Sequence, residues 1–280
     1  MILPDDPPPG GPWDAPFARC PFALIDCEMT GPDPARDALL EVAVLRVEGG
    51  AVVDSLESLV HTETPSHPHA LAMHGITPES LVDAPRFDAL APRLEALLAG
   101  AIPVMHGADL DVVFLNGAYE PLGGRPLLGP VLDTVLLARR VVHTRTYGLS
   151  ALATRLSLGA RRWHRAGEDV RAVHDLFAHV TGVLRPETAR ELWEVRVGQD
   201  GPARVRGSFE QLFARMQGSR RAVSLLVRTP GHDPTTLVAR IERWSPPYLH
   251  LATGQRGANG VRVLRADRVL FAEESSARVR

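Results

Sequence analysis

The residues of this chain best suited to chemistry are four carboxylates and one histidine, which lie in three short segments. They are Asp26 with Glu28, then Asp111, and finally His164 with Asp169. Carboxylate oxygens are hard ligands of the kind that Mg²⁺ and Mn²⁺ prefer. A histidine side chain, which titrates near neutral pH, can take a proton from water. Together these groups indicate a site that cuts phosphodiesters with the help of divalent cations.

Asp26 and Glu28 stand at the end of a short apolar run, residues 21–29, which is typical of a buried strand. Because positions i and i+2 of a strand share a face, the two carboxylates point the same way and Cys27 points the other way. Two carboxylates this close repel each other unless cations neutralise them. The alternative, a polar strand end with two solvated acids, is disfavoured by the apolar run before them.

Asp111 follows a second apolar run, Ile102–Met105, and falls in the first turn of a helix predicted to begin near Asp109. The helix dipole favours a carboxylate in this position even without a metal. This segment alone is therefore equally compatible with a structural role and a metal-binding role. The other two segments favour metal binding.

His164 precedes Gly167 on a predicted loop, and Asp169 lies in the first turn of a predicted helix over residues 169–184. A loop histidine is usually only a solvated residue, and Asp169 has the helix dipole as an alternative partner. The spacing between the two favours a general base beside a metal ligand. His174, inside the same predicted helix, is the nearest rival and is better explained as a packed or surface residue.

The three segments together resemble the motifs of the DEDDh, or DnaQ-like, family of 3′–5′ exonucleases, which includes the epsilon proofreading subunit of bacterial DNA polymerase III. The run Asp26-Cys-Glu-Met-Thr-Gly31 matches the first motif of the family. The run His106-Gly-Ala-Asp-Leu-Asp-Val-Val-Phe-Leu115 matches the second, with Gly107 and Leu110 replacing Asn and Phe. The third motif, a histidine and an aspartate separated by four residues, matches His164 and Asp169.

The resemblance implies a pair of divalent cations, Mg²⁺ or Mn²⁺, and release of nucleoside 5′-monophosphates from the 3′ end. It implies that Asp26, Glu28 and Asp169 hold one cation. Asp26 would also bridge to the second cation, on which Asp111 acts largely through water. It implies that His164 is the general base.

Neighbouring residues are predicted to contact the substrate. Met29 and Thr30 directly follow the ligand pair and are candidates for contact with the terminal nucleotide. The resemblance places His74 and Ile76 nearby, where Ile76 is expected to pack on a base and His74 either to contact the substrate or only to order the loop. His106 is expected to reach the sugar or phosphate. Trp163 is a candidate for base stacking, and an ordinary exposed loop residue is the alternative.

The elements that must position these residues are readable in outline. Residues 1–19 are rich in Pro, Gly and Asp and are predicted to be disordered. Residues 20–183, which the resemblance covers, alternate strand and helix patterns, with a hairpin over residues 39–60 and a helix over residues 87–98. This alternation favours an α/β fold of three layers with a mixed sheet, as in ribonuclease H-like exonuclease domains.

The rest of the chain has a different character. Residues 184–217 are charged and predict a helical linker. Residues 218–280 contain short apolar runs punctuated by Gly and Pro, which predict a small β-rich, barrel-like or SH3-like C-terminal domain. Its strands are predicted over residues 223–227, 236–241, 248–251 and 261–264. Its last segment faintly resembles the WYL ligand-sensing module.

Composition limits the class of protein. The hydrophobic share is 45%, which is ordinary for a soluble globular chain. No apolar run approaches the roughly 20 residues that a membrane span needs, no secretory signal is visible, and two cysteines are too few for a disulfide scaffold. The expected compartment is the cytoplasm, with no membrane partner.

Charge is unevenly distributed along the chain. Residues 1–200 carry 27 acids and 17 arginines, a balance of −10, and residues 201–280 carry 6 acids and 14 arginines, a balance of +8. The basic C-terminal segment is suited to attract phosphate backbones. Solvated surface arginines are the alternative.

The sequence as a whole predicts a divalent-metal-dependent 3′–5′ exonuclease that acts on single-stranded DNA ends in repair or proofreading, with replication or repair proteins as candidate partners. Two alternatives stay open. One is a 3′–5′ exoribonuclease with the same residues. The other is a non-catalytic nucleic-acid-binding regulator on an exonuclease fold, which the complete set of five residues disfavours.

Overall fold

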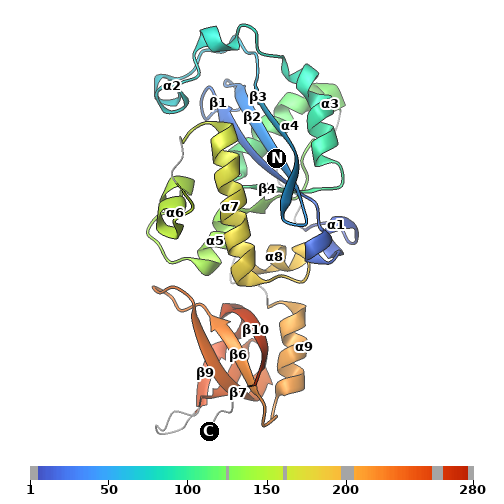
Figure 1. The fold of residues 1–280 in the computed structure, drawn as a ribbon, viewed down its shortest axis with the longest axis vertical. Helices are drawn as coiled ribbons and strands as arrows, with labels where there is room; N and C mark the ends of the chain where they lie inside the picture. Colours follow the sequence, from blue (N-terminus) through green and yellow to red (C-terminus); the bar gives the residue numbers. More distant parts are fainter. Residues whose placement is uncertain (1–5, 124–125, 160–162, 197–204, 254–260, 277–280) are drawn as a thin grey trace. The chain divides into compact units, whose positions relative to one another are not determined.

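The structure is a computed structural model that describes residues 6–123, 126–159, 163–196, 205–253 and 261–276 (Figure 1). The chain divides into two units. We call the first, which comprises Met1–Val135, Thr146–His179 and Glu187–Arg190, the N-terminal unit. The second, which comprises Leu136–Arg145, Val180–Pro186 and Glu191–Arg280, is the C-terminal unit.

The described part of the N-terminal unit is built on a mixed five-stranded sheet with the strand order β3-β2-β1-β4-β5. The strands are β1 (Phe22–Met29), β2 (Leu39–Glu48), β3 (Ala51–Leu59), β4 (Ile102–Met105) and β5 (Leu132–Asp133). The β2–β3 hairpin is antiparallel and adds to β1, whereas β4 and β5 run parallel to β1. The predicted mixed sheet is confirmed.

Helices cover both faces of this sheet (Figure 1). The inward face of β1 and β2 packs in one hydrophobic core with α3 (Phe87–Leu98) and α4 (Asp109–Gly123). On the other face, α7 (Ala166–Leu184) brings Phe177 to 5.0 Å from the ring of Phe22. The buried side chains of α7 recur at helical spacing, as an amphipathic helix on a sheet requires. The three-layer α/β architecture is therefore confirmed.

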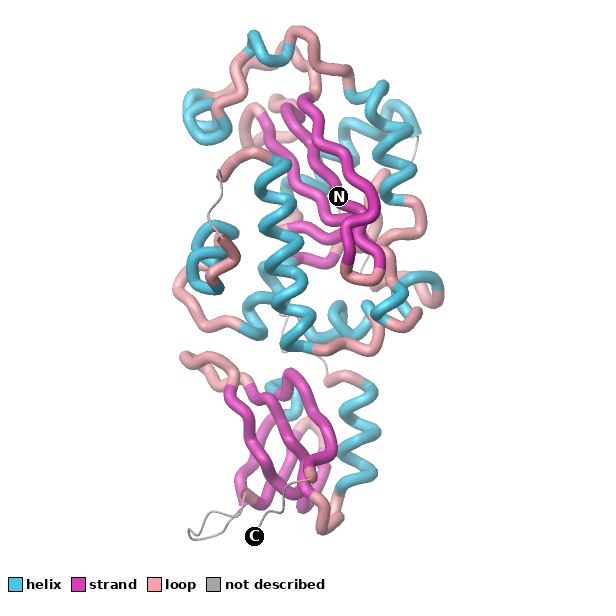
Figure 2. Tube along the Cα trace, viewed as in Figure 1, coloured by secondary structure: helices cyan, strands magenta, loops and turns pink. Residues whose placement is uncertain are grey.

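The remaining helices are short (Figure 2). Their bounds are α1 (Gly11–Asp14), α2 (Pro68–His74), α5 (Thr134–Val141), α6 (Leu149–Leu156), α8 (Ala189–Val195) and α9 (Gly207–Met216), with 3₁₀ turns over Phe17–Arg19, Pro78–Leu81 and Ala266–Arg268. Among the described residues, no helix combines the length and the apolar character that crossing a membrane requires.

The N-terminal segment differs from its prediction. Trp13 of α1 is only 5% exposed, and the backbone N–H of Phe17 donates to the carbonyl of Glu187 at 2.7 Å. The predicted disorder is therefore wrong for residues 6–19, and residues 1–5 lie outside the described part. The segment is rich in Pro and Gly but also contains Trp13, whose burial offsets part of the entropy cost of ordering it.

The C-terminal unit carries an antiparallel five-stranded sheet, within its described residues, with the order β10-β6-β7-β8-β9. The strands are β6 (Ala222–Val227), β7 (Thr235–Ser245), β8 (Tyr248–Ala252), β9 (Val261–Arg265) and β10 (Val269–Ser275). The predicted β-rich domain and its predicted strands are confirmed, and β10 was missed. Helix α9 packs Phe209, Phe213 and Met216 into the core of this sheet. Residues 207–216 therefore belong to this unit and not to a helical linker, which corrects the prediction for residues 184–217.

A buried arginine joins several segments of the C-terminal unit. Arg206 is 1% exposed and donates from Nη1 to the carbonyl oxygen of Leu184 at 2.8 Å. It pairs with Glu191 at 3.4 Å, and its Nη2 also contacts the carbonyl of Leu270 in β10. The end of α7, the helix α8 and strand β10 are thus held by one guanidinium.

We expect the substitution Arg206→Met to destabilise the C-terminal unit, because it leaves the buried carboxylate of Glu191 without this cation. Removing one partner of a buried pair costs about 3–5 kcal/mol in the free energy of unfolding. Urea denaturation followed by circular dichroism measures the loss. The matched control is Arg215→Met, which breaks an exposed pair with Glu274 and should cost less than about 1 kcal/mol. Equal losses for the two variants would contradict the role assigned to Arg206.

Candidate active site

Strand β1 supplies the first two carboxylates of the candidate site. Asp26 and Glu28 lie near the C-terminal end of β1, opposite Ala43 and Glu41 of β2 in the register. Cys27, between them, points into the core beneath α3 and α4 and is 7% exposed. The predicted alternation of the two carboxylates with Cys27 is therefore confirmed.

Two helix N-termini bring the other carboxylates to the same place. Asp111 lies in the first turn of α4, directly after β4, and Asp169 lies in the first turn of α7. Because β4 runs parallel to β1, the carboxyl ends of the two strands meet at one edge of the sheet. Both carboxylates are 8% exposed.

His164 lies beside these groups. Its ring, the carboxylate of Glu28 and that of Asp169 each offer a ligand atom, and these atoms all lie within 4.8 Å of one another. The backbone N–H of His164 donates to Oδ2 of Asp169 at 3.0 Å. The structure thus brings together the five residues that the motifs singled out.

Burial and mutual repulsion disfavour the ionised form of the carboxylates in this site. Burial raises the pKa of Asp26 well above its usual range, and the nearby carboxylates of Asp111, Asp169 and Glu28 raise it further. Burial, with the charge of Asp169 next in weight, raises the pKa of Glu28 to about 8. Burial and the charge of Asp133 raise the pKa of Asp111 to about 7. A divalent cation would relieve this repulsion.

The donor set fits such a cation. Oδ1 of Asp169 is buried and has no hydrogen-bond partner among the described residues. Four carboxylates converge on one place, and the hard oxygen donors they offer are those that Mg²⁺ and Mn²⁺ prefer. The burial of these oxygens is better explained by a cation than by solvent.

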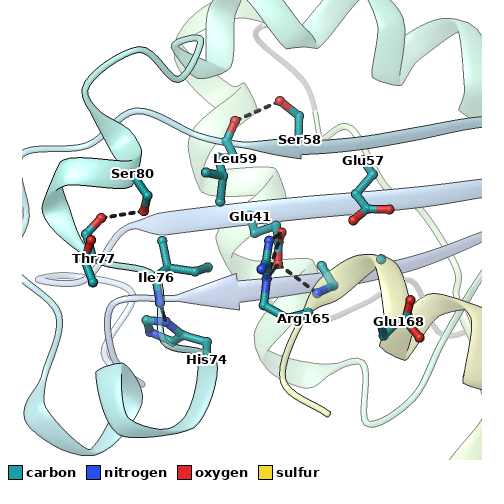
Figure 3. A network of polar contacts seen from close by, with 12 residues as sticks. Glu41, Glu57, Ser58, Leu59, His74, Ile76, Thr77, Ser80, Arg165 and Glu168 are labelled. Carbon is teal, nitrogen blue, oxygen red and sulfur yellow. Dashed lines mark hydrogen bonds and ion pairs between the residues drawn. The ribbon is translucent and has the colours of Figure 1, made fainter. Parts of the chain in front are cut away.

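Glu41 is a site residue that the sequence analysis missed. It lies on β2 opposite Glu28 and is 1% exposed. Its carboxylate accepts hydrogen bonds from Arg165 and from the backbone of Ala166 (Figure 3). The only signal in the sequence was a single acid within the apolar run of residues 39–47.

Two predicted substrate contacts are held in internal hydrogen bonds. Thr30 is fully buried, and its Oγ1 donates to Asp37 at 3.2 Å and accepts from the backbone N–H of Ala38 at 2.9 Å. The ring of His106 contacts Oγ1 of Thr134 at 2.8 Å and the carbonyl of Tyr147 at 2.9 Å. Both side chains therefore support loops around the site.

A second pair of predicted contacts is also buried. His74 accepts a hydrogen bond at Nδ1 from the backbone N–H of Ile76 at 2.9 Å (Figure 3). Ile76 is 4% exposed and packs with Leu40 and Leu81. Met29 and Trp163, by contrast, are partly exposed. They are the predicted contacts whose surfaces stay accessible to a substrate.

The sequence of the chain is similar to those of known exonucleases and polymerases. A sequence model of the exonuclease family matches residues 23–177 of the chain. The DNA polymerase III PolC-type of Thermotoga maritima is 28% identical over 187 residues, which are 67% of this chain and 14% of that protein. The corresponding protein of Bacillus cereus is 29% identical over 152 residues, which are 54% of this chain and 11% of that protein. The chain therefore spans only a small part of the length of these relatives.

Solved structures share the fold. The zinc-bound complex of Escherichia coli exonuclease I with single-stranded DNA superposes with a TM-score of 0.55 at 13% identity, over 92% of this chain and 65% of that one. Exonuclease I of Methylocaldum szegediense gives a TM-score of 0.50 at 14% identity, over 89% of this chain and 63% of that one. Because 92% of this chain is covered in the first case, the likeness in fold extends into the C-terminal unit.

The raised pKa values predict that the metal-free protein loses stability as the pH rises. Glu28 and Asp111 have ordinary values of 4.5 and 3.8, but about 8 and about 7 in the folded state. Between these limits the folded state binds more protons than the unfolded chain. Stability that is present at low pH is therefore lost as the pH rises through the folded-state values. We expect the melting temperature in EDTA to fall between about pH 6 and about pH 8.5.

Added Mg²⁺ should raise the melting temperature most at the higher pH, where the carboxylates are ionised and repel each other. Differential scanning calorimetry with EDTA or with Mg²⁺ at both pH values measures the effect. The substitution Glu28→Gln removes one titrating group and should flatten the pH dependence in EDTA. A melting temperature in EDTA that does not change with pH would contradict the raised pKa values.

Proposed function

The chain belongs to the exonuclease family, and on this premise we propose that it is a divalent-metal-dependent 3′–5′ exonuclease that releases nucleoside 5′-monophosphates from single-stranded DNA. Family membership confirms the resemblance to DnaQ-like exonucleases and the predicted class of enzyme. The observation that carries the proposal is the convergence of His164 on the carboxylates of Glu28 and Asp169. That cluster lies beside Asp26, whose pKa is raised by burial and by the nearby carboxylates.

Each residue has a proposed role. Asp26, Glu28, Asp111 and Asp169 would hold the divalent cations, which polarise the phosphate and increase the acidity of water. His164 removes the proton from the attacking water. Asp169 also accepts the backbone N–H of His164, so a single carboxylate would bind a cation and fix the segment that carries the base. Burial of the carboxylates strengthens every charge interaction in the site.

DNA is the proposed substrate, and replication, repair or proofreading is the proposed setting. The relatives are DNA polymerases of the PolC type, and the exonuclease I that shares the fold was solved with single-stranded DNA. These facts concern those proteins, and for this chain they support the proposal of DNA ends as substrate and of replication or repair proteins as partners. An exoribonuclease would use the same site residues.

A time course of cleavage tests the reaction and the substrate. Single-stranded DNA and RNA of the same sequence, each labelled at the 5′ end, are incubated with Mn²⁺, with Mg²⁺ or with EDTA. We expect a ladder that shortens from the 3′ end of DNA with either metal and no cleavage in EDTA. Faster cleavage of RNA than of DNA would show that RNA, not DNA, is the preferred substrate. If the protein binds DNA but cleaves neither substrate with either metal, the enzyme proposal fails and a non-catalytic nucleic-acid-binding protein is the better explanation.

Substitutions test the assigned roles. We expect Asp26→Ala to abolish cleavage while binding of single-stranded DNA persists. The substitution His164→Ala should lower kcat by about 10²–10⁴-fold, the usual contribution of a general base, without lowering the affinity for Mn²⁺. The matched control is His174→Ala, because His174 lies on α7, the helix that follows His164, and contacts Asp175 at 3.3 Å. Normal cleavage by both site variants would show that the site is wrongly assigned.

A further inference from the structure

An ion pair beside the proposed site has no role in the mechanism described above. Glu41 and Glu28 are direct neighbours in the register of β2 and β1, so their side chains share the face that carries Asp26. Glu41 raises the pKa of Asp26 and of Glu28. A fifth carboxylate in this position increases the repulsion that the cations must neutralise, so its presence calls for an explanation.

The carboxylate of Glu41 is fully engaged within the protein (Figure 3). Nη2 of Arg165 donates to Oε1 at 2.6 Å, and Nε of Arg165 donates to Oε2 at 3.1 Å. The backbone N–H of Ala166 donates to Oε2 at 2.9 Å. Both oxygens of Glu41 therefore face the start of α7, and this carboxylate is not available to hold a cation.

The two residues that Glu41 binds directly follow His164 in the chain. His164 has a φ of 62°, in the left-handed region that residues with a side chain rarely adopt. Such a conformation is strained and persists only where the surroundings impose it. Here the surroundings are an anchor on each side. The N–H of His164 is held by Asp169, and residues 165 and 166 are held by Glu41.

The same end of α7 lies very close to strand β3. A Cβ atom added at Gly167 would lie 2.1 Å from the carboxyl carbon of Glu57. The contact is made by the end of the flexible Glu57 side chain, which is 46% exposed and can move aside. The anchors of the segment before α7 are therefore the contact of Asp169 with His164 and the Glu41–Arg165 pair.

We propose that Glu41 and Arg165 are positioning residues, whose ion pair holds residues 164–166 so that the His164 ring faces Glu28 and Asp169. The inference rests on the proposed function, in which His164 is the general base. It predicts that the pair affects the rate of cleavage through His164, and not through substrate binding or metal binding.

The test removes the pair without leaving a buried charge. The double variant Glu41→Gln with Arg165→Met replaces both partners by neutral groups, and Arg165→Lys keeps the charge but loses the two-pronged geometry. We expect kcat of the double variant to fall by about 10–100-fold, because a misplacement of about 1 Å can cost that much. The KM for single-stranded DNA and the Mn²⁺ affinity from calorimetry should not change. Arg165→Lys should give a smaller fall in kcat.

The matched control is Arg171→Met. Arg171 of α7 also pairs with two acids, Glu57 of β3 and Glu168 of α7, both at 3.1 Å, but its side chain is 47% exposed. Its loss should leave kcat unchanged.

The decisive comparison repeats the double variant in the His164→Ala background. If the pair acts through His164, its removal there should cause no further fall in kcat. An equal fall in both backgrounds would reduce the pair to general structural support and overturn the proposal. A changed KM, a changed Mn²⁺ affinity or an unchanged kcat would overturn it as well.

A measurement without cleavage separates this inference from the proposed function. Hydrogen–deuterium exchange of the segment 163–170 should be faster in the double variant than in the wild type and unchanged in Arg171→Met. Unchanged exchange in the double variant would overturn the positioning role, whether or not the wild type cuts DNA. A wild type that does not cut DNA overturns the proposed function instead.

Discussion

Repulsion among buried carboxylates is the constraint on which the N-terminal unit depends. Asp26 is surrounded by the charges of Asp111, Asp169, Glu28 and Glu41, and burial adds to their effect on its pKa. Electrostatic repulsion alone would drive these carboxylates apart. The sheet register and the two helix N-termini hold them together, and the dipoles of α4 and α7 offset part of the cost. The remaining repulsion is a driving force for cation binding.

Side chains of the same type serve different purposes around this site. Glu28 and Glu41 are direct neighbours across two strands, yet Glu41 is neutralised by Arg165 and Glu28 is not paired in the same way. Glu41 is also more deeply buried than Glu28, and the two residues differ in their hydrogen-bond partners although they are of the same type. Thr30 and His106 follow the same logic, since their polar atoms are occupied by the loops they support. A carboxylate is suited to hold a cation only where the fold leaves at least one of its oxygens without a protein donor, as it does with Oδ1 of Asp169.

The sequence was informative where function follows from local spacing. The alternation of Asp26 with Cys27, and the acids at the starts of α4 and α7, depend only on strand and helix periodicity. Glu41 could not be found in this way, because its partner Arg165 is 124 positions away. Strand β10 was missed for a related reason. Its pairing with β6 is non-local, and Glu273 and Glu274 interrupt its apolar pattern.

The positive charge of the last eighty residues is a net balance of +8, which already subtracts the six acids of that segment. Arg206 is buried against Glu191, Arg215 and Arg221 both pair with Glu274, and Arg265 pairs with Asp267. Charges that are neutralised within the fold contribute little to the field at the surface. Glu274 and Asp267 are already counted in the balance, so of these four pairs only that of Arg206 with Glu191, which precedes the segment, lowers the charge below +8.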